Sequence, residues 1–150
     1  MLTFSSCALL AAPVAPGYTQ GSATIEQLSI PGIDFPTEPL ALTLGSFISD
    51  PSEQVMGGAR AVFGKPGDWQ VYLERFGKGS GPGQLTIRAP SDPDGSISGV
   101  TGQVGTGCRA DVTEASAAGL VGTISCEDMT GSIAGKSSGI SAKVSFQALP

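Results

Sequence analysis

Two cysteines in the last third of the chain constrain the fold more than any other feature of the sequence. Cys108 and Cys126 each lie on the apolar side of a run in which apolar and polar residues alternate. An antiparallel pairing that sets Cys108 opposite Cys126 also sets Ala110 opposite Ile124 and leaves a loop over residues 115–119. Directly opposite residues on one face of a hairpin lie within reach of a disulfide. We therefore predict a Cys108–Cys126 disulfide, which indicates an oxidising compartment.

Composition excludes several kinds of chemistry and of partner. The 150 residues include no histidine, so a Ser-His-Asp triad or an imidazole metal site cannot form within this chain. A net charge of −5 with only eight Lys and Arg residues gives no basic surface for nucleic acid or for an anionic membrane. We expect no catalytic residue, no cofactor and no metal site.

Short apolar runs with a period of two recur along the whole chain, separated by Gly, Pro and Asp about every ten residues. No window holds a helical apolar stripe that is free of Gly and Pro. The pattern predicts an all-β fold: an antiparallel β-sandwich of seven to nine strands, with an open barrel as the second choice. The predicted core gathers the apolar positions of these runs, namely Trp69, Val71, Leu73, Leu85, Ile87, Ile124, Ile140, Val144 and Phe146.

The first 22 residues form a separate zone. Positions 2–15 are uncharged and mostly apolar or small, and a polar stretch follows up to Ser22. This pattern is typical of the end of a secretory signal peptide, although a basic start is missing. The apolar stretch is too short to span a membrane, and Pro13 and Pro16 break it. We predict a signal-like or disordered segment over residues 1–22 and a single domain over residues 23–150.

Cys7 lies in this N-terminal zone and has two interpretations. The run Phe4-Ser5-Ser6-Cys7 is similar to a bacterial lipobox, whose cysteine is acylated after cleavage. Only six residues precede Cys7, whereas an apolar region of about 7–15 residues normally leads up to a cleavage site. We favour an ordinary small residue at this position over a lipid anchor.

Residues 24–44 carry three prolines, Pro31, Pro36 and Pro39. Each proline removes a backbone donor, which predicts that this segment lies at a sheet edge or forms a bridging arm. The leucines that alternate over residues 40–44 are expected to be buried against their own sheet in a lone domain. In an assembly subunit they would be buried only between chains.

The strand that starts at Trp69 has apolar residues on both faces. Trp69 is in phase with Val71, which assigns the indole to the core rather than to the surface. Tyr72 and Phe76 lie on the opposite face, with Arg75 at the strand's end, and form the nearest approach to an exposed aromatic patch. Either these three are candidate surface-contact residues, or the strand is covered on both sides.

The C-terminal half resembles a known class of proteins. The strand Gly122-Thr123-Ile124-Ser125-Cys126, with Cys108 before it and a final strand ending at Phe146, resembles the end of small exported β-sandwich proteins. These include the surface lipoprotein antigens of actinobacteria. The resemblance covers about residues 84–150 and implies an extracytoplasmic, non-enzymatic β domain, either free or tethered to a membrane.

Three functions follow as hypotheses. The leading one is an exported, non-catalytic domain at the cell surface or outside the cell, acting by surface recognition or packing. The second is a structural subunit of a fibre or surface layer, in which residues 24–44 pair with a neighbouring chain's sheet edge. The third is a carboxylate-based hydrolase, which would require two carboxylates that converge in a cleft.

Overall fold

The structure is a computed structural model, and it describes residues 18–32, 39–48, 60–74, 79–81, 83–90, 95–100, 107–116, 118–133 and 135–150. Within these residues the fold is all-β and antiparallel, as predicted, and contains no helix. The strands are β1 (Gln20–Ser29), β2 (Leu40–Ile48), β3 (Arg60–Phe63), β4 (Gln70–Glu74), β5 (Gly79–Gly81), β6 (Gln84–Arg88), β7 (Ser96–Val100), β8 (Gly107–Ser116), β9 (Gly119–Glu127), β10 (Thr130–Ser132) and β11 (Ser141–Leu149).

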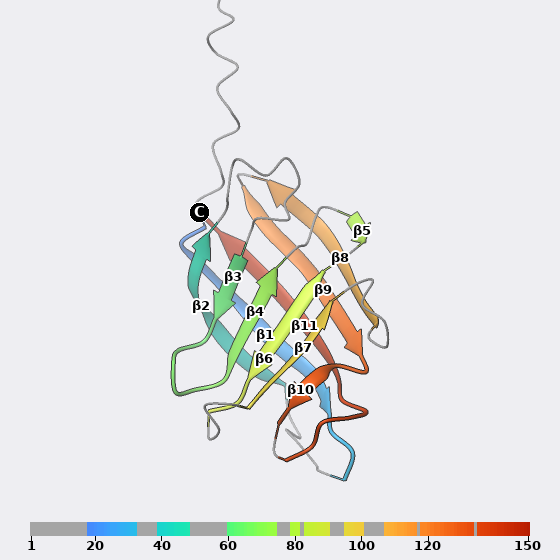
Figure 1. The fold of residues 1–150 in the computed structure, drawn as a ribbon. Helices are drawn as coiled ribbons and strands as arrows, with labels where there is room; N and C mark the ends of the chain where they lie inside the picture. The colour runs from blue at the N-terminus through green and yellow to red at the C-terminus, as the bar shows by residue number, and fades with distance from the viewer. Residues whose placement is uncertain are drawn as a thin grey trace, which may run out of the picture.

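All of these strands belong to one sheet that curls around a core (Figure 1). Their order across the sheet is β10-β7-β6-β4-β3-β2-β1-β11-β9-β8-β5. β2 pairs with β1 on one side and with β3 on the other, so the two facing halves are continuous. The architecture is therefore an open half-barrel, the second of the two arrangements that the sequence pattern allowed. The structure has eleven described strands where we predicted seven to nine, because β5 and β10 are too short to show an alternating pattern.

Both ends of the sheet finish in a three-residue strand of Gly, Ser and Thr. β5 covers part of the outer edge of β8, and β10 covers part of the outer edge of β7. β5 lies between β4 and β6 in the sequence, so the chain leaves one half of the sheet, touches the other half and returns (Figure 1). Short polar edge strands offer few free backbone groups of their own to another chain, although β8 extends beyond β5 at both ends.

The β8–β9 hairpin has the register that the cysteine pattern predicts. Cys108 is opposite Cys126, and Ala110 is opposite Ile124. The two cysteines form a disulfide, and both are buried. This part of the prediction is confirmed.

The end of the same hairpin differs from the prediction. β8 continues to Ser116 and β9 begins at Gly119, where we expected a loop over residues 115–119. The strands extend further because the register shifts at Thr113, an extra residue that has no directly opposite residue on β9. Such a bulge increases the local twist and changes the direction of the outward side chains.

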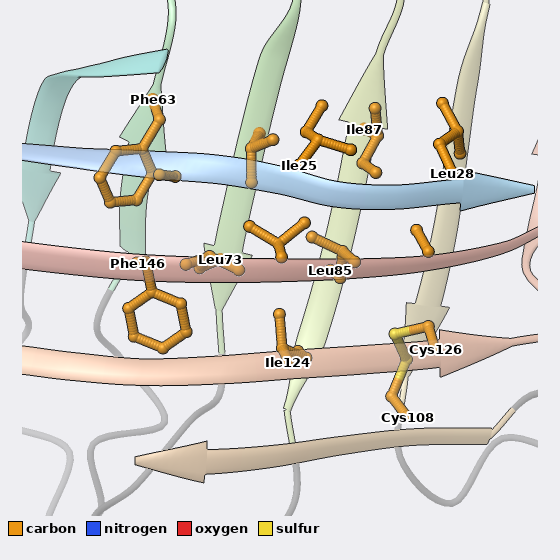
Figure 2. Packing of buried hydrophobic residues seen from close by; sticks show 14 of the residues in the cluster. Ile25, Leu28, Phe63, Leu73, Leu85, Ile87, Cys108, Ile124, Cys126 and Phe146 are labelled. Atoms are coloured by element: carbon orange, nitrogen blue, oxygen red, sulfur yellow. A yellow bond between two sulfur atoms is a disulfide. The ribbon is translucent and has the colours of Figure 1, made fainter. Parts of the chain in front are cut away.

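The predicted core residues lie together in one interior, between the two halves of the sheet (Figure 2). All of them except Trp69 are buried, and Trp69 is partly buried and packs against the same core. Figure 2 shows side chains from both halves in this cluster, among them Ile25 and Leu28 of β1 and Leu73 and Ile87 of the facing half. The alternation of apolar and polar residues therefore predicted these core residues correctly.

The disulfide also contacts the facing half of the sheet, at Gly99 of β7. A Cβ atom built on Gly99 would lie 2.5 Å from Cys108 Sγ and 3.0 Å from Cys126 Sγ. Only glycine allows the β7 backbone to approach the two sulfur atoms this closely. β7 and β8 are not neighbours in the sheet, so this contact connects two strands near its opposite ends without a backbone ladder.

The prediction that the proline-rich segment lies at a sheet edge is wrong for the strand that it contains. β2 is an interior strand with partners on both sides. Pro31 lies in the turn after β1, and Pro39 immediately precedes β2, so neither removes a donor from the ladder. The leucines of residues 40–44 are partly buried and pack against the core of their own chain.

The folded domain begins before the predicted boundary at residue 23. Tyr18 is buried, with 4% of its surface exposed, and β1 starts at Gln20. The backbone N–H of Thr19 donates to the carbonyl of Leu149 at 2.9 Å, so the chain already runs beside β11 at this point. Residues 18–22 belong to the domain; residues 1–17 lie outside the described residues.

Candidate functional site

Small polar side chains line the outward face of four adjoining strands, β1, β11, β9 and β8. Alternate positions of these strands are buried, so the positions between them point outward. The register brings Thr24, Ser145, Thr123 and Asp111 side by side, one from each strand. We call these four residues the central row. Because neighbouring strands lie about 4.8 Å apart, the row is about 14 Å long.

A groove with a volume of about 410 Å³ lies over the central row. Ser22 and Gln147 line it on one side of the row, together with Val121 and Thr113. Its volume falls within the range of small-ligand sites, and seven of its ten lining residues have polar side chains. We call this feature the outer groove.

The hydrogen bonds formed within the outer groove leave some of its side-chain donors and acceptors without a partner among the described residues. Ser145 Oγ donates to Glu26 Oε1 at 2.7 Å, and Gln147 Nε2 donates to Ser22 Oγ at 3.4 Å. Thr24 and Thr123 flank Ser145, and their hydroxyls have no hydrogen-bond partner within the described parts of the chain. A hydroxyl both donates and accepts. The middle of the groove therefore offers two uncommitted donors and several acceptors.

Asp111 is fixed at one end of the central row. Ser80 of β5 donates its hydroxyl hydrogen to Asp111 Oδ1. Arg109 Nε lies 3.7 Å from the same oxygen, and Arg109 Nη2 donates to Ser80 Oγ at 3.1 Å. Both contacts to the carboxylate use Oδ1, which leaves Oδ2 able to accept from a ligand. The short strand β5 thus orients a residue of the groove.

Tyr18 stabilises the hairpin end beside the groove. Its hydroxyl donates to the carbonyl of Ser116 at 2.5 Å and to the carbonyl of Gly119 at 3.1 Å. Its ring makes an edge contact with Phe47, with ring centres 4.6 Å apart. Burial raises the pKa of the Tyr18 phenol above 10.0, and the carboxylate of Glu114 acts in the same direction.

Of the three candidate surface-contact residues, only Tyr72 of β4 lies among the described residues. Tyr72 is half-buried on the outward face, opposite to Val71 and Leu73, as predicted. The guanidinium of Arg88 lies over its ring, 5.7 Å from the centroid, and the Tyr72 hydroxyl donates to Gln70 Oε1 at 3.4 Å. Arg75 and Phe76 lie outside the described residues, as does the candidate lipid anchor Cys7. The described residues therefore show a Tyr72–Arg88 pair but no larger aromatic patch.

The described strands and turns contain neither a candidate metal site nor a membrane-spanning helix. They contain no group of three or more His, Cys, Asp or Glu residues that could hold a metal ion. No helix long and apolar enough to cross a membrane occurs in the same residues.

Sequence reasoning did not find the outer groove, although part of its signal was present. The alternation over the last strand assigns Ser145 and Gln147 to the outward side, and the structure places them there. Their neighbours on β1 could not be identified, because Ser22 and Gln147 are 125 positions apart in the sequence. Pairing between such distant strands leaves no local pattern.

Comparison of the chain with family models, with curated proteins and with solved structures finds no match.

Proposed function

We propose that the protein is an exported, non-catalytic recognition domain whose binding surface is the outer groove. The buried disulfide supports export, because such bonds form and persist in oxidising compartments. The observation that carries the proposal is the groove itself. Half-buried hydroxyls from three strands meet in register, and two of them have no partner among the described residues.

A role as an assembly subunit is the second candidate. Pairing through residues 24–44 would require a free strand edge there, but β1 and β2 each have two neighbours in the sheet. The two terminal strands, β5 and β10, are three residues long. These features favour recognition by a face of the sheet over pairing at its edge.

A fragment screen by NMR tests the recognition proposal and does not require the ligand to be identified first. The full chain is labelled with ¹⁵N and titrated with a library of small polar and apolar fragments. We expect the shifts to concentrate at the amides of β1, β9 and β11 that border the outer groove, including those of Thr123 and Ser145. Ligand sites collect fragments because they are concave and combine different polar groups.

Two matched variants provide the control. Thr123→Arg fills the groove, whereas Thr86→Arg places the same bulk at a half-buried outward position of β6 on the other half of the sheet. Fragment shifts should disappear in the first variant and persist in the second. Shifts that gather around Tyr72 and Arg88 instead, or that survive Thr123→Arg, would overturn the assignment of the groove as the binding surface.

A further inference from the structure

We infer that the ligand of the outer groove is a neutral, polyhydroxylated chain, that is, a saccharide polymer lying along the central row. This inference rests on the proposed function and adds the chemical class of the ligand. It follows from three properties of the groove: its hydrogen-bond capacity, its charge and its shape.

The hydrogen-bond capacity of the central row matches a ligand that carries hydroxyls. Thr24 and Thr123 can each donate and accept. The Ser145 hydroxyl uses its hydrogen for Glu26, so its lone pairs remain to accept from a ligand. Asp111 Oδ2 can only accept. A ligand must therefore supply donors to Ser145 and Asp111 and acceptors to the two threonines, and a row of sugar hydroxyls does both.

The charges around the groove disfavour ionic ligands. Asp111 repels an anion, and the chain as a whole carries a net charge of −5. Asp111 does not offer an unpaired negative charge to a cation either, because Arg109 lies 3.7 Å from its Oδ1 and Ser80 donates to the same atom. No lysine or arginine lines the groove. Glu26, which accepts the Ser145 hydroxyl hydrogen, is a second carboxylate beside the row and adds to the repulsion of an anion. A neutral ligand meets no such repulsion.

The shape of the groove fits an extended chain better than a single compact molecule. The central row crosses four strands over about 14 Å, and the volume over it is about 410 Å³. Val121 is 38% exposed beside the row and offers one apolar contact for the C–H face of a ring. No aromatic side chain points outward among the residues that line the groove, since Phe146 faces the core. Several weak hydrogen bonds along a polymer would then replace one strong stacking contact.

Three polymers that share one backbone test the class of ligand. The full chain labelled with ¹⁵N is titrated with dextran, with dextran sulfate and with diethylaminoethyl-dextran, which are neutral, anionic and cationic. A soluble β-glucan tests a second neutral linkage, and a Gly-Ser peptide polymer tests a neutral chain without sugar hydroxyls. We expect a neutral glucan to shift the amides around Thr24, Thr123 and Ser145, and the two charged dextrans and the peptide to bind more weakly.

Isosteric variants show whether the hydroxyls make the contacts. Thr123→Val and Thr24→Val remove a hydroxyl that has no partner among the described residues, so thermal unfolding should change little. Each should weaken neutral-glucan binding about three- to tenfold, the loss expected for one hydrogen bond. Thr86→Val removes a hydroxyl of the other half of the sheet, which lies 2.9 Å from Ser98 Oγ, and should leave binding unchanged.

The outcomes separate this inference from the proposed function. Groove shifts with a neutral glucan that weaken in both threonine variants support the inference. Groove shifts only with a charged dextran or with the peptide overturn the ligand class but leave the groove as the binding surface. Fragments that bind the groove when no polymer does also overturn the class. If neither fragments nor polymers shift the groove, the inference and the proposed function both fail.

Discussion

Tyr18 shows how much a single side chain contributes to the start of this domain. The preceding residues have no strand-like alternation, so the sequence pattern assigned Tyr18 to a terminal segment. The structure buries its ring against Phe47 and directs its hydroxyl to two carbonyls of the β8–β9 hairpin. The signal that sequence reasoning lacked is tertiary, because Ser116 is 98 positions away.

We expect Tyr18→Phe to lower the free energy of unfolding by about 1–3 kcal/mol at neutral pH, because the buried carbonyl of Gly119 and the part-buried carbonyl of Ser116 lose their donor. The pKa of the phenol is raised in the folded state, so this stabilisation is complete below about pH 10 and decreases as the pH rises further. The difference between wild type and Tyr18→Phe should therefore shrink at about pH 11. Urea unfolding, monitored by tryptophan fluorescence at neutral pH and at about pH 11, measures this difference in the free energy of unfolding. Tyr72→Phe is the control. A difference that grows with pH would contradict the proposed burial of the neutral phenol.

At the scale of strands, local pairings were predictable and distant ones were not. The β8–β9 hairpin follows from alternation and from two cysteines 18 positions apart. β2 was misjudged because prolines near a strand suggest an edge, while Pro31 and Pro39 lie outside the ladder and Pro36 lies outside the described residues. The groove depends on β1 pairing with β11 and β11 pairing with β9, and only the second of these pairings joins strands that are close in sequence.

The contact of β7 with the β8–β9 hairpin can be tested at Gly99. We expect Gly99→Ala to cost about 1–3 kcal/mol, because the new methyl group would meet both sulfur atoms of the disulfide and force β7 outward. Gly107→Ala is the matched control, since a Cβ at this strand position meets nothing within 4 Å. Thermal and urea unfolding of the oxidised proteins gives the comparison. Equal stability of the two variants would show that β7 does not depend on the close approach.

The architecture of the whole molecule depends on whether the sheet is continuous. A sandwich and an open barrel have the same alternation in every strand, because each strand buries one face in both. The distinction rests on β2, which pairs with both halves. No residue pattern within one strand encodes that choice, so all-β class and core could be predicted while the closure of the sheet could not.

Two deletions locate the true start of the domain. Removing residues 1–16 keeps Tyr18 and all of β1, and we expect a folded monomer that melts like the full chain. Removing residues 1–22 also deletes Tyr18 and the β1 positions that pair with residues 147–149 of β11. This second deletion should lower stability by about 3–5 kcal/mol, the cost of losing a large buried aromatic side chain. Calorimetry and light scattering distinguish the two proteins. Equal melting temperatures would restore the boundary at residue 23.

The pairing of β1 with β11 also determines when the protein can fold. β1 precedes the other described strands in the sequence, yet one of its two ladder partners is β11, and Ser22 and Gln147 are 125 positions apart. Until β11 has been synthesised, β1 and β9 lack the strand that lies between them in the sheet. The core also lacks the buried side chains of Val144 and Phe146. Sheets built on such distant pairings form slowly. The complete sheet therefore cannot form before residues 141–149 have been synthesised.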